Sequence, residues 1–252
     1  MWQTVTRKSS KYQLQSTVTS FVPTGHNVEL LHVEIENTAQ HTQKITPVAA
    51  VPIYGRSADN IRDHRHVTSL LHQIAVTAQG VEVTPKLSFD ERGHQKNQIT
   101  YFVYGVSGSG EMPEQFFPVT EDFIGEGGSL MAPLAVKNNA AGVAAGTRID
   151  GKEALGGLKF ASVALGSGET AAYTVIIGAS ANMDDMRSVV TAYDSREKVQ
   201  EALKNTQTGW QEKVNVSFRT GDKAVDSYLR WICFQPILRR LYGCSFLPHH
   251  DY

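Results

Sequence analysis

This sequence has little cysteine and almost no net charge. Its 252 residues contain 2 cysteines, Cys233 and Cys244, and the formal net charge at pH 7 is −1. If both cysteines lie on one helix, their separation along the chain places them roughly 16 Å apart. A disulfide needs Cα atoms within roughly 7 Å, so we expect two reduced thiols, as in a cytoplasmic protein. The charge balance gives no support for binding to nucleic acid or to an anionic membrane.

Long apolar runs and well-known catalytic motifs are also missing. No run of about 18 apolar residues exists, so the sequence predicts no membrane-spanning helix. Residues 1–7 lack the apolar segment of a secretory signal. The sequence has no Gly-rich phosphate loop before a helix, no nucleophile elbow and no paired-cysteine motif. We therefore assign no catalytic residue, no metal site and no cofactor.

What the first 180 residues contain is a series of short strands separated by turns. Residues 31–36 alternate strictly between apolar and polar, which predicts a strand with one wet face. Residues 44–54 are almost continuously apolar and predict a strand buried on both faces. The Ala/Gly/Asn-rich residues 138–168 predict loops around a single strand at 158–163. Further strands are expected at residues 12–22, 67–76, 81–89, 97–106 and 170–177.

Because no long helix separates these strands, the sequence predicts a mainly β fold. The expected architecture is a large antiparallel two-sheet β-sandwich followed by C-terminal α-helices. The composition, 41% apolar and 19% charged, fits an ordinary globular protein.

Helical patterns begin near residue 183. Asp194 and Glu197 have the spacing of a capping box at a helix start. A second helix is expected from Thr220 or Asp222 to about Tyr242, with apolar residues around nearly its whole circumference. Such a helix requires burial on more than one side, and the sandwich can cover only one. We therefore expect a missing partner, either another subunit or the rest of a longer protein.

Three polar clusters are candidates for a functional site. Residues 54–66 combine three Arg, two Asp and two His. The arginines could bind a phosphate or a sugar through their planar set of donors. Alternatively, the residues form a loop that is stabilised by its own ion pairs. His64 and His66 could also ligate a metal, although the spacing identifies no third ligand. Residues 89–97 form a second cluster, which a solvated hairpin turn also explains. Its adjacent Asp90 and Glu91 would point to opposite faces of a strand, which excludes a glycosidase pair.

The third cluster, residues 249–252, fits either a surface loop or the leading edge of a catalytic loop. Tyr101, Phe102 and Tyr104 could stack on sugar rings, although aromatic residues in a strand are more typical of a core. The residues selected as substrate or interface candidates are Arg56, Arg62, Asp63, Arg65, His66, Arg92, His249, His250, Asp251 and Tyr252.

Several stretches together resemble one known enzyme family. They are VPIYGRSADN at residues 51–60, RDHRH at 62–66, FDERGH at 89–94 with Tyr101-Phe102, Phe123-Ile124-Gly125 with GGSLMAP at 127–133, and RWICFQ at 230–235 with LYGCS at 241–245. The chain thereby resembles the glycoside-hydrolase family of cellobiose phosphorylase, chitobiose phosphorylase and 1,2-β-oligoglucan phosphorylase, and is most similar to the last type.

The resemblance implies a galactose-mutarotase-like super-sandwich at residues 1–182, a helical linker at 183–221 and the first helix of a truncated (α/α)6 barrel at 222–252. Family members cleave β-glucosidic bonds with inorganic phosphate as co-substrate, and their catalytic groups lie in the barrel. They form homodimers in which a sandwich loop reaches the neighbouring active site. The resemblance implies that role for the loops around Arg62 and Arg92.

These observations leave three hypotheses. The chain is the non-catalytic sandwich of a phosphorylase acting on β-1,2-gluco-oligosaccharides or cellobiose-like substrates. Alternatively, it is a stand-alone carbohydrate-binding module for β-glucan oligosaccharides. Finally, it is a subunit whose barrel-bearing partner is encoded separately.

Overall fold

The computed structural model describes residues 2–55, 68–90 and 93–241 of the chain. It has two compact units, one formed by residues 2–203 and the other by residues from 204 onwards. Helix α5 (Arg196–Lys213) begins in the first unit and ends in the second. Among the described residues, no helix combines the length and the apolar character needed to cross a membrane.

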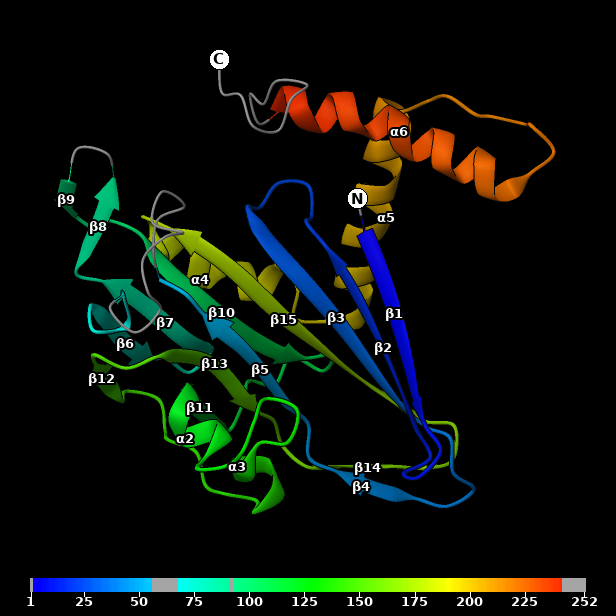
Figure 1. Cartoon of the computed structure of the whole chain (residues 1–252). Helices are drawn as coiled ribbons and strands as arrows, with labels where there is room; N and C mark the ends of the chain where they lie inside the picture. Colours follow the sequence, from blue (N-terminus) through cyan, green and yellow to red (C-terminus); the bar gives the residue numbers. More distant parts are fainter. Residues whose placement is uncertain (1, 56–67, 91–92, 242–252) are drawn as a thin grey trace. The chain divides into compact units, whose positions relative to one another are not determined.

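An eight-stranded antiparallel sheet dominates the first unit (Figure 1). Its strand order is β1-β2-β3-β15-β10-β7-β6-β12, so β1 and β12 are its two edges. Strand β15 pairs with β3 on one side and with β10 on the other, so a late segment of the chain lies in the middle of the sheet. The strands are β1 (Trp2–Ser9), β2 (Leu14–Phe21), β3 (Val28–Asn37), β6 (His72–Val76), β7 (Gly80–Pro85), β10 (Thr100–Ser107), β12 (Arg148–Asp150) and β15 (Thr170–Ser180).

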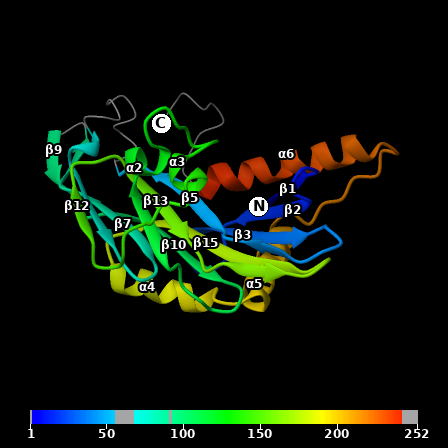
Figure 2. The ribbon, with the colours of Figure 1, turned by 90° about the horizontal axis from the view of Figure 1, so that it is seen from below.

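A three-stranded antiparallel sheet in the order β11-β13-β5 packs on one face of the large sheet (Figure 2). Val83 and Val103 of the large sheet meet Ile53 and Leu158 of the small one in a shared core. Burial of each such side chain contributes about 1.5–3 kcal/mol. The small sheet comprises β5 (Val48–Ile53), β11 (Gln115–Val119) and β13 (Ala154–Lys159), and two strand pairs are β4 (Gln43–Ile45) with β14 (Val163–Leu165) and β8 (Leu87–Asp90) with β9 (Gly93–Lys96).

Helices cover the outer faces of both sheets. On the small sheet, Phe123 packs against Leu155 in a separate cluster. On the large sheet, Val190 of α4 packs against Tyr104, on the opposite side from the small sheet. These helices are α2 (Thr120–Ile124), α3 (Leu134–Lys137) and α4 (Met183–Ala192). The predicted mainly β, antiparallel sandwich is therefore confirmed.

The glycine-rich residues 138–168, expected to hold a single strand at 158–163, contain three short strands separated by loops. Strands β12 and β13 both begin before residue 158, β13 ends at Lys159 and β14 begins at Val163, so residues 160–162 of the expected strand lie between two strands. Gly156 and Gly157 lie inside β13 because neighbouring chain leaves no room for a side chain. A Cβ at Gly156 would lie 2.3 Å from Val103 Cβ, and one at Gly157 would lie 2.5 Å from the Phe117 carbonyl oxygen. Glycine here permits a close approach rather than a turn.

Three other predicted strands need correction. The run at 44–54 divides into β4 and β5, and most of its side chains are only half-buried. Thr68 and Ser69 are helical, so the strand predicted at 67–76 begins only at His72. The prediction that β3 has one solvent-exposed face is partly wrong. His32, expected on that face, is buried, whereas Leu31 is half-buried. Arg196, at the start of α5, contacts Glu34 on that face.

The starts of α5 and α6 were predicted to within a residue or two, whereas the short helices α2 and α3 were not predicted. Ser195 rather than Asp194 caps α5, since its hydroxyl accepts a hydrogen bond from the Lys198 amide at 3.3 Å. Asp194 instead pairs with the Lys198 ammonium at 2.7 Å. Helix α6 (Lys223–Leu241) starts after Asp222, whose carboxylate accepts from the Ala224 amide at 2.8 Å.

Within the second unit, α6 packs on the end of α5 through aromatic rings. The ring centroids of Trp210 and Phe234 lie 5.4 Å apart. Other large apolar side chains of α6 stay exposed, with Tyr228 62% and Trp231 48% accessible. The nearly uniform apolar circumference predicted from the sequence is thus only partly covered. Cys233 is a free thiol, and Cys244 lies outside the described residues.

Candidate functional site

A polar groove on the outer face of the large sheet is the candidate site. It lies beside the start of α4 and has a volume of about 590 Å³, within the range of ordinary ligand pockets. Strands β6, β7, β10 and β12 form its floor. Its lining residues are Gln73, Ile74, Ala75, Glu82, Thr84, Thr100, Arg148, Asp150, Met183 and Arg187.

Strand register explains why polar side chains gather here. Alternate residues of a strand point to opposite faces, so Val81 and Val83 enter the core while Glu82 and Thr84 face outward. Cross-strand pairing aligns Asp150 with Gln73 and Gln73 with Thr84. The Thr84 hydroxyl in turn lies 2.7 Å from that of Thr100. One polar row therefore crosses four adjacent strands.

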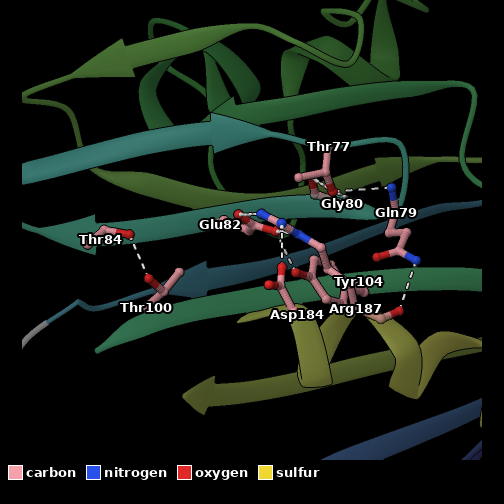
Figure 3. Close-up of polar contacts among 9 residues, drawn as sticks. All are labelled: Thr77, Gln79, Gly80, Glu82, Thr84, Thr100, Tyr104, Asp184 and Arg187. Atoms are coloured by element: carbon pink, nitrogen blue, oxygen red, sulfur yellow. Dashed lines mark hydrogen bonds and ion pairs between the residues drawn. The ribbon is translucent and has the colours of Figure 1, made fainter. Parts of the chain in front are cut away.

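A buried carboxylate anchors the groove to α4 (Figure 3). The Glu82 side chain is 8% exposed. It accepts a hydrogen bond from the Tyr104 hydroxyl at 2.6 Å and bonds from Arg187 Nε at 3.0 Å and Nη2 at 2.9 Å. Asp184 adds an outer ion pair to Arg187 at 3.6 Å. These three donors offset part of the cost of burying the Glu82 carboxylate.

The same network changes the acidity of its members. Burial, followed by the hydrogen bond to Glu82, raises the pKa of Tyr104, so this phenol stays protonated at any physiological pH. The Glu82 carboxylate raises the pKa of Arg187, which fixes a permanent positive charge beside the groove. Tyr104 and Arg187 therefore act as hydrogen-bond donors to Glu82 and not as sources of protons.

Two other groove side chains, Arg148 and Gln73, are available to bind a ligand. Among the described residues, neither the Arg148 guanidinium nor the Gln73 amide has a hydrogen bond or ion pair within the chain. Both side chains are exposed on the strands at the sheet edge. They are free to donate hydrogen bonds to a ligand, and Arg148 offers a planar fork of donors.

A smaller cavity involves Tyr54, the first residue of the first predicted cluster. It has a volume of about 40 Å³ and is lined in part by Tyr54 and His72. His72 Nδ1 lies 3.1 Å from the Lys152 carbonyl oxygen, while its buried Nε2 has no hydrogen-bond partner among the described residues. Burial lowers the pKa of His72, which favours the neutral ring. Gly55, the second residue of that cluster, packs against this histidine.

Comparison with known proteins assigns the sandwich to a family. Residues 3–196 match the family model described as the supersandwich domain of glycosyl hydrolase 94 (GH94). This chain belongs to the GH94 family. The match covers nearly the whole first unit of the GH94 chain, which confirms the predicted family resemblance.

The other two comparisons add little about the GH94 chain. A search of curated proteins gives no match. The chain is similar to a solved structure described as a polysaccharide lyase, with 9% identity over 74% of this chain and 23% of that chain, and a TM-score of 0.42. A similarity of that size carries no argument about the activity of the GH94 chain.

All ten residues selected from the sequence lie outside the part of the GH94 chain that the structure describes. Arg56 to His66 fall in residues 56–67, Arg92 in 91–92, and the last four in 242–252. Their roles stay predictions. Tyr104 and Phe102, considered as sugar-stacking residues, are buried in the core, where their rings stack at 4.6 Å.

Sequence reasoning missed the polar groove of the GH94 sandwich. Its one sequence signal is Glu82, a carboxylate between two valines in a strand, which alternation alone places on a solvent face. Its partner Arg187 is 105 residues away in sequence, and no spacing rule connects them. Within the described residues of the GH94 chain, no three His, Cys, Asp or Glu side chains are arranged to hold a metal ion.

Proposed function

We propose that this chain is the non-catalytic sandwich and linker of an inverting β-glucoside phosphorylase. The supporting observation is the family match over residues 3–196. The reaction of the whole enzyme would be phosphorolysis of β-1,2-gluco-oligosaccharides or cellobiose-like substrates to glucose 1-phosphate. Inorganic phosphate is the co-substrate, and no cofactor is required. The proposed division keeps residues 1–182 as sandwich, 183–221 as linker and 222–252 as the first barrel helix.

The exposed apolar side chains of α6 support the last part of this proposal. Val225, Tyr228 and Ile232 follow one another at helical spacing and are each at least 42% exposed. Burial of such side chains against further helices would contribute about 1.5–3 kcal/mol each. We propose that the helices of a catalytic barrel supply that cover, whether they belong to the same polypeptide or to a separately encoded subunit.

The decisive experiment measures phosphate-dependent release of glucose 1-phosphate from β-1,2-gluco-oligosaccharides and from cellobiose. The 252-residue chain is expected to release none. The chain together with any coding sequence beyond Tyr252, or with a co-purifying barrel-bearing protein, is expected to be active. Phosphorolysis by the 252-residue chain alone would contradict the non-catalytic role.

The proposed roles of the sandwich are dimerisation and shaping of the active site through the loops around Arg62 and Arg92. In the active form, Arg62→Ala and Arg92→Ala are expected to lower kcat/KM by tenfold or more, because each removes a charged hydrogen-bond donor. Arg7→Ala, on the exposed edge strand β1, is the matched control. Equal activity in all three variants would rule out this role for both loops.

A further inference from the structure

We propose that the groove between α4 and the β12 edge of the large sheet binds a neutral oligosaccharide. This site involves none of the residues predicted from the sequence. It is independent of the phosphorolytic activity proposed above, because it is formed entirely within the first unit, by strands β6, β7, β10 and β12 and helix α4.

Most charged groups of the groove are already paired with a charge of the opposite sign. Two carboxylates, Glu82 and Asp150, face two guanidinium groups, Arg148 and Arg187. Glu82 and Arg187 neutralise each other at 2.9 Å, and Asp150 pairs with Lys86 at 3.4 Å. Arg148 is the one charged lining residue without an ionic partner within the described residues, so the groove presents mainly paired charges and neutral polar groups. A ligand with many uncharged donors and acceptors can use both kinds of group.

The spacing of the polar row suits a linear, hydroxyl-bearing ligand. Neighbouring strands lie about 4.8 Å apart, so the row from Asp150 through Gln73 and Thr84 to Thr100 spans about 14 Å. Carboxylate, amide and hydroxyl groups thus follow one another from strand to strand along the groove floor. Each accepts or donates a hydrogen bond in the manner that sugar hydroxyls require.

The groove also supplies fixed and free hydrogen-bonding groups side by side. Arg187 is held by Glu82 and cannot turn away, which limits the entropy lost when a ligand binds. Arg148 and Gln73 have no partner within the described residues and remain available. Met183 provides an apolar wall against which a sugar ring can lie.

The test is isothermal titration calorimetry of the 252-residue chain with cellotetraose, a β-1,2-linked glucotetraose, maltotetraose and inorganic phosphate. We expect binding of at least one tetrasaccharide and none of phosphate. Arg148→Ala should weaken that binding about tenfold, through loss of charged hydrogen bonds. Thr84→Val, which removes one hydroxyl, should weaken it about threefold.

Two variants at the opposite edge of the same sheet serve as controls. Arg7→Ala removes an exposed arginine from edge strand β1, and Thr6→Val disrupts a cross-strand threonine pair like that of Thr84. Both should bind like the parent. The proposal is overturned if no tetrasaccharide binds, if phosphate binds instead, or if both Arg148→Ala and Thr84→Val leave the affinity unchanged. Because phosphorolysis is measured separately, failure here leaves the proposed function standing.

Discussion

The buried carboxylate of Glu82 adds a polar contact between the sheet and helix α4, which also packs on the sheet through apolar side chains such as Val190. Glu82 lies between two core valines, and its charge is tolerated because Tyr104 and Arg187 donate three hydrogen bonds to it. Removing one partner of such a pair leaves the other desolvated and unpaired, which costs more than the pair contributes. The integrity of this contact therefore depends on Arg187 more than on any exposed charge nearby.

Replacing Arg187 by Leu is expected to lower the free energy of unfolding by about 2 kcal/mol. This value is below that for a fully buried pair, because the Arg187 side chain is 45% exposed. Urea denaturation followed by circular dichroism measures it. Asp184→Ala, at a side chain 94% exposed, is the control and should leave stability unchanged. Equal losses in both variants would show that Glu82 does not depend on Arg187.

A buried histidine on β3 makes stability sensitive to acid. Burial lowers the pKa of His32, Arg196 lowers it further, and Glu34 partly opposes both. Both ring nitrogens lack hydrogen-bond partners among the described residues. The unfolded chain therefore takes up a proton near pH 6.5, whereas the folded chain takes it up only at lower pH.

Stability is accordingly expected to be complete above about pH 6.5 and to decline as the pH falls below that value. The contribution of one histidine to this slope is at most about 1.4 kcal/mol per pH unit. His72, whose pKa burial also lowers, adds to it in the same direction. Unfolding curves of His32→Leu and the double variant with His72→Leu should show progressively flatter slopes. A parent curve that is level from pH 7 to pH 5 would contradict this account.

At the level of the element, strand β13 depends on two glycines. Gly156 lies against Val103 of the large sheet, so it sets how closely the two sheets approach. A methyl group at this position would overlap the valine, and well-packed cores respond to such insertions with losses of about 1–3 kcal/mol. Adjacent Gly157 approaches the backbone of β11 in the same way.

We expect Gly156→Ala to lower the free energy of unfolding by about 2 kcal/mol or more, measured by urea titration. The control is Ala164→Ser, which adds one atom at an exposed position of β14 and should have little effect. If Gly156→Ala were as stable as the parent, the sheets would have to be more loosely packed at this point than the structure shows.

At the level of the whole molecule, the apolar surface of α6 should govern association. Tyr228 and Trp231 are exposed, and surfaces of this kind promote contact between proteins. In analytical ultracentrifugation, the 252-residue chain is expected to self-associate with rising concentration. Trp231→Glu should weaken that association at least tenfold, while Lys223→Glu, on the same helix, should have little effect. A chain that stays monomeric at high concentration would count against the proposed role of α6.

The sequence by itself determined the fold class, the family and the positions of several elements, because alternation and capping are local signals. The strand from residue 170, the start of α6 and the burial of Tyr104 all followed from such patterns. The glycines of β13 were misread, because a glycine that permits close packing has the same sequence signature as one that permits a turn.

Only the tertiary structure decided where the polar groove lies. Arg148, Gln73 and Thr84 look like ordinary surface residues in the sequence, and they share one floor because β12 pairs with β6 and β6 with β7. The contact between Glu82 and Arg187 also depends on the placement of α4 on the sheet. Pairings between distant segments arise from the packing of whole elements, so a local sequence pattern does not predict them.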